Sequence, residues 1–340
     1  MSGPVGPGDL ARRLTELPVV IESHSVELGA IPVDGYYDGA DRPTGVVALA
    51  GGAHVGHGEN VDWTAAGQER FAAVCRDLIS RVLPAGPTSL GTIVESLARS
   101  GAHPHHRAAL EAAALDLALH LAGVDLFDLT GGRFRPIRTC RSIGREEVGR
   151  GGPLAPVESL LERDPNARIK IDCPPDGWEE DVWRRLAGTG RVVVVDFKRE
   201  GVADQLEIAH RLLPDAWIED PPADLIRRAD SRPRPWLRRV ALDGYVTAAS
   251  DLEAPPFPPA AVNVKAPRVG GPFEALAILE ICRTSGWIAY FGGMFEVSVG
   301  RRQARVLASL FTAEAWNDLD PLTGPASHHD PAPGTMPGFG

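Results

Sequence analysis

From about residue 134 onward, short apolar runs alternate with amphipathic stretches, and this alternation constrains the fold more than any other feature of the chain. Seven strand-like runs occur at 137–143, 167–172, 191–197, 216–220, 239–243, 261–267 and 287–293. Helices are predicted between them at 156–163, 178–188, 202–213, 223–230, 271–285 and 299–311. Such alternation is typical of βα units around a parallel sheet. It predicts a (β/α) barrel, although an open doubly wound sheet would show the same local pattern.

The N-terminal third of the chain has a different pattern. Residues 17–60 contain short apolar or alternating runs broken by Gly, Pro and Asp, which is typical of strands and turns. Helical patterns follow at 65–83 and 107–123, and the second, rich in Ala and Leu, stops at Gly123. Strands followed by helices predict an α+β unit. Because 340 residues leave room for about two domains, we expect this unit to precede the barrel as a separate domain.

Charge and missing motifs exclude several classes of partner. With 35 Lys and Arg against 45 Asp and Glu, the net charge is −10, which disfavours nucleic acids and anionic membrane surfaces and makes a small molecule the expected partner. No dinucleotide or P-loop motif follows a predicted strand, so the open doubly wound sheet loses its usual ligand. No apolar run approaches the length of a membrane span and no signal peptide is evident, so we expect a soluble, cytoplasmic protein.

Charged residues lie within or at the end of five consecutive predicted strands: Lys170, Asp196, Glu219, Asp243 and Lys265. The carboxyl ends of barrel strands meet at one mouth, where active sites are found. Three carboxylates supply the hard oxygen ligands that Mg²⁺ prefers. A partly desolvated lysine beside such a cation has its neutral form favoured and can accept a carbon-bound proton. A single acid at a strand end is more often a helix N-cap or a surface ion pair, but that alternative explains the whole set poorly.

Several segments together carry a resemblance to a known family. They are 107–132 (RAALEAAALDLALHLAGVDLFDLTGG), 168–172 (RIKID), 218–221 (IEDP), 263–271 (NVKAPRVGG) and 292–310 (GGMFEVSVGRRQARVLASL). In this order and spacing they resemble the enolase superfamily, in its muconate-lactonizing and o-succinylbenzoate synthase-like branch. The resemblance covers nearly the whole chain and identifies it as a divergent member.

The resemblance implies a modified barrel, (β/α)7β, with an α+β capping domain. The capping domain would comprise residues 1–130 together with a C-terminal strap at 320–340, and the barrel residues 131–319. Loops of the capping domain would close over the mouth of the barrel. We therefore expect residues 17–60 to set substrate selectivity.

The resemblance also implies roles for individual residues. Lys170 and Lys265 would be acid/base residues on opposite faces of the substrate. The metal ligands would be Asp196, Glu219 and Asp243, binding Mg²⁺ or alternatively Mn²⁺. Three further residues, Gly292, Gly293 and Met294, would line the side that holds the substrate carboxylate, where glycines allow close backbone approach.

Departures from the family pattern include two charged residues near the expected site. Arg168 replaces the first lysine of the KxK strand; its guanidinium stays protonated and could still hold down the pKa of the neighbouring lysine. Lys198 stands where the family usually has Asn, two residues after Asp196, and would point to the same side if the strand extends that far. Its ammonium could occupy the metal's place, act as an additional acid or be solvated in a loop. We place both residues among the substrate-binding candidates.

The leading hypothesis is an Mg²⁺-dependent lyase or isomerase that removes the α-proton of a carboxylate substrate to give an enediolate. By resemblance, o-succinylbenzoate synthesis and N-acylamino acid racemisation are the nearest activities, followed by cycloisomerisation and dipeptide epimerisation. The alternative is a metal-free binding or scaffolding protein in which Lys198 replaces the metal. An ammonium of Lys198 that bridges Asp196 and Glu219 would favour this alternative. The capping domain could also serve as a surface for a homo-oligomer.

Overall fold

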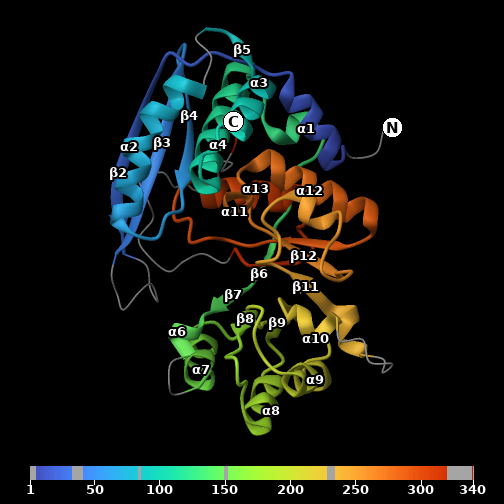
Figure 1. The fold of residues 1–340 in the computed structure, drawn as a ribbon. Helices are drawn as coiled ribbons and strands as arrows, with labels where there is room; N and C mark the ends of the chain where they lie inside the picture. The colour runs from blue at the N-terminus through green and yellow to red at the C-terminus, as the bar shows by residue number, and fades with distance from the viewer. Residues whose placement is uncertain are drawn as a thin grey trace.

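The computed structural model describes residues 5–32, 41–82, 86–148, 152–227, 234–319 and 339. An N-terminal unit of strands and helices is followed by a parallel sheet with helices around it (Figure 1). The elements of the N-terminal unit are α1 (Pro7–Thr15), β1 (Pro18–Val19), β2 (Ser23–Ile31), β3 (Arg42–Gly51), β4 (His54–Asn60), α2 (Ala65–Val82), β5 (Thr88–Ser89), α3 (Leu90–Arg99), α4 (Pro104–Ala122) and α5 (Leu126–Thr130). The expected strands in 17–60 and the helices after them are confirmed.

Helix α4 packs closely against the antiparallel sheet β2-β3-β4. Two glycines of β4 make this possible: a Cβ at Gly56 would lie 2.2 Å from the backbone N of Leu117, and one at Gly58 would lie 1.9 Å from the carbonyl of Ala109. The helix is buried along nearly its whole length, which fits its Ala- and Leu-rich sequence. It ends at Gly123, as predicted, in the left-handed conformation that glycine adopts without strain (φ 65°).

The barrel follows as alternating strands and helices. Its strands are β6 (Arg138–Thr139), β7 (Arg141–Ile143), β8 (Ile169–Asp172), β9 (Val192–Asp196), β10 (Trp217–Glu219), β11 (Val240–Leu242), β12 (Ala261–Val264), β13 (Ile288–Phe291) and β14 (Trp316–Asn317). Its helices are α6 (Arg145–Val148), α7 (Leu154–Arg163), α8 (Glu180–Gly188), α9 (Ala203–Leu212), α10 (Ala223–Arg227), η3 (Pro235–Arg239), η4 (Ala249–Leu252), α11 (Ala266–Val269), α12 (Pro272–Ser285) and α13 (Val299–Phe311). All seven predicted strands are present.

Strands β7 to β13 form one parallel sheet in sequential order. Strand β14 connects its two edges. It pairs in parallel with β6, which leads into β7, and Asp318 directly after it forms a bridge with Gly292 after β13. Seven βα units and a final strand thus give the expected (β/α)7β architecture. The two-residue β14 is the strand that the sequence pattern does not reveal.

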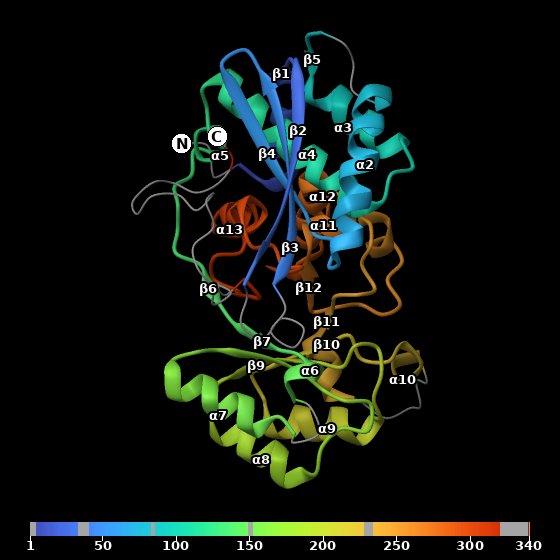
Figure 2. The ribbon, with the colours of Figure 1, turned by 90° about the vertical axis from the view of Figure 1, so that its left-hand side faces the viewer.

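Residues of both parts of the chain meet at a seam between the N-terminal unit and helices α11 to α13 (Figures 1 and 2). Arg107 of α4 donates to the carbonyls of Val269 and Gly270, and Glu111 accepts the N–H of Phe273 at the start of α12. Helices α6 to α9 lie at the opposite end of the molecule from the β2-β3-β4 sheet (Figure 2).

The C-terminal strap expected at 320–340 lies outside the described residues apart from Phe339. That ring is buried in the seam, beside α4 and α13. Residues 33–40, within the region expected to set selectivity, also lie outside the described part. Among the described residues, no helix combines the length and the apolar character needed to cross a membrane.

Candidate active site

Three carboxylates gather at the carboxyl ends of neighbouring strands. Asp196 and Glu219 are the last residues of β9 and β10 and pair directly across the sheet, while Asp243 follows β11. All three are buried, and one oxygen from each lies within 4.8 Å of the others. This register places hard oxygen donors at one level of the barrel mouth, as the strand-end argument requires.

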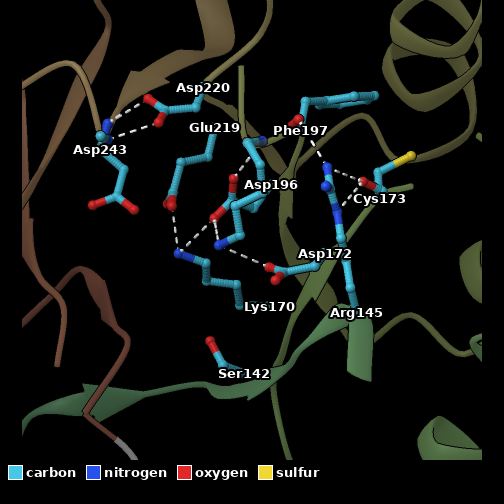
Figure 3. Close-up of polar contacts among 12 residues, drawn as sticks. Ser142, Arg145, Lys170, Asp172, Cys173, Asp196, Phe197, Glu219, Asp220 and Asp243 are labelled. Carbon is cyan, nitrogen blue, oxygen red and sulfur yellow. Dashed lines mark hydrogen bonds and ion pairs between the residues drawn. The ribbon is translucent and has the colours of Figure 1, made fainter. Parts of the chain in front are cut away.

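Lys170 of β8 points into this group from one side (Figure 3). Its buried ammonium donates to Glu219 and lies 3.1 Å from Oδ2 of Asp196 and 3.6 Å from Oδ2 of Asp318. Burial by itself would lower the pKa of Lys170, but the surrounding carboxylates, above all Glu219 and Asp196, raise that pKa well above its ordinary value. The lysine is therefore cationic in this arrangement.

Lys265, directly after β12, approaches from the other side. Its Nζ lies 3.0 Å from Oδ2 of Asp243, whose other oxygen accepts a hydrogen bond from Arg268. Burial lowers the pKa of Lys265, and the neighbouring guanidinium of Arg268 lowers it further against the attraction of Asp243. The two cations beside Asp243 outweigh its burial and hold the pKa of that carboxyl well below its usual range. Because β9, β10 and β11 separate β8 from β12, the two lysines flank the three carboxylates.

Glu219 is held by neutral donors as well as by Lys170. The hydroxyl of Tyr290 donates to Oε2, and Nδ2 of Asn263 lies 3.3 and 3.4 Å from the two oxygens. These donors come from β13 and β12, across the interior of the barrel. They orient a carboxylate that has no access to solvent.

Asp220 organises the backbone beside Asp243. Asp220 has a positive φ of 46°. Its carboxylate accepts hydrogen bonds from the backbone N–H groups of Asp243 and Gly244, both at 2.7 Å (Figure 3). A Cβ at Gly244 would lie 2.9 Å from Oδ2 of Asp220. Gly244, which has no side chain, thus leaves room for this contact.

Lys198 follows β9 in the left-handed conformation (φ 53°) and turns back toward the mouth. Its Nζ lies 2.5 Å from Oδ2 of Asp196 and 3.1 Å from Oδ1 of Asp172, and its backbone N–H donates to Oδ1 of Asp196. The ammonium thus bridges Asp196 and Asp172, whereas Lys170 bridges Asp196 and Glu219. From the sequence, a bridge from Lys198 to both Asp196 and Glu219 would have favoured the metal-free alternative. The second partner in the structure is Asp172 and not Glu219.

The other candidates occupy different places. A Cβ at Gly292 would lie 2.6 Å from Cε of Lys265, so this glycine makes room for the lysine stem. Gly293 donates its N–H to the carbonyl of Asp318, and Met294 is buried. Arg168 precedes β8 and donates to the carbonyl of Gly190, before β9. The structure therefore does not bring Arg168 to the carboxylates, which lie at the carboxyl ends of the strands.

Sequence reasoning missed several residues of this site: Asp172, Asn263, Arg268, Tyr290 and Asp318. Asp172 and Asn263 stand two positions from Lys170 and Lys265, so the period of two along a strand could have found them. Asp318 gave no signal because β14 is too short to recognise. Arg268 and Tyr290 gave none because their contacts depend on distant strands.

Two family models match the chain. The C-terminal domain of a family described as a domain of unknown function, DUF8230, matches residues 134–323, which is more than half of the chain. The chain belongs to this family. The N-terminal domain of the same family, DUF8230, matches residues 12–129.

Curated relatives are enzymes. The o-succinylbenzoate synthase of Geobacillus kaustophilus is 29% identical over 227 residues, which are 60% of this chain and 56% of the relative. The L-Lys-D/L-Arg epimerase of Methylococcus capsulatus is 29% identical over 265 residues, which are 73% of this chain and 67% of the relative. The match thus spans little more than half the length of the first of these relatives.

A solved structure of a dipeptide epimerase from Methylococcus capsulatus, complexed with Mg ion, has the same fold. The TM-score is 0.68 at 24% identity, covering 86% of this chain and 87% of that chain. Fold and relatives together confirm the resemblance to the enolase superfamily found in the sequence.

The residues present fit a divalent cation. Asp196, Glu219 and Asp243 offer one oxygen each within 4.8 Å of one another, and carboxylate oxygens are the ligands of Mg²⁺. The three buried carboxylates repel one another, and the lysines beside them offset this repulsion only in part. Burial and these like charges raise the pKa of Glu219 well above its ordinary value, against the attraction of Lys170.

Proposed function

We propose that the protein is an Mg²⁺-dependent lyase or isomerase that removes the α-proton of a small carboxylate substrate. The observation that carries the proposal is the placement of two buried lysines, Lys170 and Lys265, on either side of the three carboxylates. The named relatives, which are synthases and epimerases, support the same reaction class.

Asp196, Glu219 and Asp243 would hold the metal. When bound, the metal would stabilise negative charge as it develops on the substrate carboxylate. The chain's own residues then have separate tasks. Tyr290 and Asn263 orient Glu219, and Asp220 fixes the backbone of Asp243.

The two lysines would move the proton. One lysine, as the neutral amine, would accept the proton from the α-carbon, and the other, as the ammonium, would give a proton to the opposite face or to a leaving group. Their approach from β8 and from beyond β12 suits either outcome, because a substrate seated over the carboxylates has one lysine at each face. Proton return to the opposite face gives racemisation or epimerisation, and loss of a leaving group gives dehydration.

Proton exchange in D₂O tests the proposal. The protein with Mg²⁺ would be incubated with N-succinylamino acids, dipeptides and the precursor of o-succinylbenzoate, and loss of the α-proton signal would be followed by NMR. Lys170→Met and Lys265→Met should each lower exchange or turnover by about 10²-fold or more. Arg184→Met, which removes an exposed cation paired with Glu180 on α8, serves as the control. Undiminished exchange in both lysine variants would contradict the assignment.

A second candidate is the metal-free binding protein, which the contact of Lys198 with Asp196 favours. Metal-stripped protein that binds carboxylates without Mg²⁺ and exchanges no α-proton would support it. Saturable Mg²⁺ binding that is lost in Glu219→Gln would exclude it.

A further inference from the structure

The side chain of Lys198 contacts the site of the proposed metal in a way that a solvated loop lysine would not. Its ammonium and its backbone N–H engage both oxygens of Asp196, and the ammonium also reaches Asp172. Asp172 stands opposite Asp196 in the register of β8 and β9, so the two carboxylates lie side by side. One ammonium thus has two alternative carboxylates within reach.

The backbone at this turn is held in a costly conformation. Lys198 and Arg199 have positive φ angles of 53° and 64°, a region in which residues other than glycine are strained. The turn is held by the N–H of Arg199, which donates to the carbonyl of Asp220 at 2.7 Å. Strain of this kind persists where the surrounding structure holds it, and it is concentrated at functional sites. Here it directs the Lys198 side chain back over the barrel mouth.

In the part of the chain that the structure describes, the carboxyl groups that take part in ion pairs at the mouth outnumber the cations paired with them. Among the described residues, the ion pairs of Lys170, Lys198, Lys265 and Arg268 join four cations to five carboxylates: Asp172, Asp196, Glu219, Asp243 and Asp318. Lys198 therefore does not neutralise the site by itself. Its charge is matched by Asp172, a carboxylate outside the proposed ligand set.

We propose that Lys198 is a tethered competitor for the divalent cation at Asp196, and that Asp172 is the carboxylate that draws it away. In this structure the ammonium contacts both carboxylates. Oδ2 of Asp196 already has Lys170 Nζ at 3.1 Å as well as Lys198 Nζ at 2.5 Å. A divalent cation bound to Asp196 would repel the ammonium of Lys198 and so favour its movement onto Asp172. The pair thereby sets the metal affinity of the site. This inference rests on the metal site of the proposed function.

Metal titration tests the proposal without any substrate. Mg²⁺ and Mn²⁺ binding to metal-stripped protein would be measured by calorimetry for four forms: wild type, Lys198→Asn, Asp172→Asn and the double variant. Lys198→Asn should bind about tenfold more tightly, and Asp172→Asn about tenfold more weakly, because the ammonium then rests on Asp196 alone. Asn tolerates a positive φ, so this variant preserves the turn. Lys198→Met, which keeps a similar aliphatic stem and removes the charge, should raise the metal affinity as Lys198→Asn does.

The double variant distinguishes contact competition from general electrostatics. If Asp172 acts through Lys198, Asp172→Asn should have less than about a threefold effect once Lys198 is Asn. Equal effects of Asp172→Asn in both backgrounds would overturn the proposal. Arg199→Gln is the matched control, since it removes a neighbouring cation whose side chain lies against Gly244 and Tyr245. If Arg199→Gln raised the metal affinity as much as Lys198→Asn does, the proposal would also be overturned.

The outcomes for the two proposals are separable. Coupled metal affinities without α-proton exchange would sustain the role of Lys198 and reject the proposed reaction. If α-proton exchange depends on Mg²⁺ but Lys198 and Asp172 are not coupled, the proposed reaction would be kept and the role of Lys198 rejected. Absence of metal binding in both the wild type and Lys198→Asn would reject the competitor and the metal site together.

Discussion

Glu59 of β4 accepts hydrogen bonds from both the backbone N–H and the hydroxyl of Ser298, 239 residues later, at 3.0 and 2.9 Å. The same buried carboxylate also accepts the N–H groups of Val297 and Gly300. It therefore binds the turn between β13 and α13 and places a negative charge at the start of α13, where the helix dipole favours it. One side chain of the N-terminal unit thus holds the segment that follows the barrel mouth.

Glu59→Gln should destabilise the protein by about 2 kcal/mol, because the amide NH₂ turns a donor toward backbone N–H groups that need an acceptor. Urea unfolding followed by circular dichroism would measure the change. Glu95→Gln is the control, since its carboxylate forms an exposed pair with Arg99 on α3 and should contribute less than about 0.5 kcal/mol. Equal losses in the two variants would contradict the role of Glu59.

Tyr290→Phe should weaken Mg²⁺ binding by about tenfold while leaving the fold intact. The substitution removes the hydroxyl that donates to Oε2 of Glu219 and preserves the ring. Calorimetric titration would measure the affinity. Tyr245→Phe is matched to it, because that hydroxyl donates to the carbonyl of Pro221, and this variant should bind metal like the wild type. A normal affinity in Tyr290→Phe would mean that the hydroxyl does not position Glu219.

The stability of the seam should depend on pH through Glu111. Burial raises the pKa of Glu111 from 4.5 to about 8, although the Phe273 N–H and Arg107 favour the ionised form and Glu274 opposes it. A raised pKa means that the folded state favours the protonated acid. This contribution is fully present below pH 4.5 and is lost as the pH rises through about 8.

Glu111→Gln should remove that dependence. Unfolding free energies measured from pH 5 to 9 should fall with pH more steeply in the wild type than in the variant, by at most about 1.4 kcal/mol per pH unit. The amide can still accept the N–H of Phe273, so the variant retains the contact at the start of α12. Parallel curves for the two proteins would show that Glu111 is ionised in the folded state.

Phe339→Ala should cost about 2 kcal/mol of stability, because it empties a site lined by small residues of α4 and α13, including Ala108, Ala112 and Ala304. Thermal unfolding would show the loss. Phe134→Ala removes a ring that is 39% exposed and should have a much smaller effect. Similar shifts for both variants would mean that the buried ring of Phe339 contributes no more to stability than an exposed one.

Much of the architecture could be predicted from the sequence because barrel strands buried on both faces read as continuous apolar runs. Val192–Asp196 is an example, with four valines followed by the acid that ends β9. The same logic found the five charged residues at strand ends. Strand β14 was not predicted because Trp316–Asn317 is too short to show a periodic pattern. Its pairing with Arg138 and Thr139 depends on how the barrel closes and leaves no local signal in the sequence.

Site residues could be predicted where their position follows from the pattern of a single strand. They could not be predicted where their contacts depend on how two strands align. Lys198 shows the difference. The sequence placed it near Asp196 by strand period, but the left-handed turn and the partner Asp172 follow from how β8 and β9 align. Arg168 shows the reverse case. It occupies a motif position, yet its guanidinium extends to Gly190 and over the ring of Trp316.

The closing strand β14 also determines when the protein can finish folding. Asn317 donates to the carbonyl of Arg138 across 179 residues, and Glu59 contacts Ser298 across 239. A ribosome makes the chain from its N-terminus, so β7 and β13 remain as open sheet edges until residues near 317 have emerged. Such edges readily pair with other chains. Closure by β14 therefore also removes two sheet edges at which chains of this protein could associate.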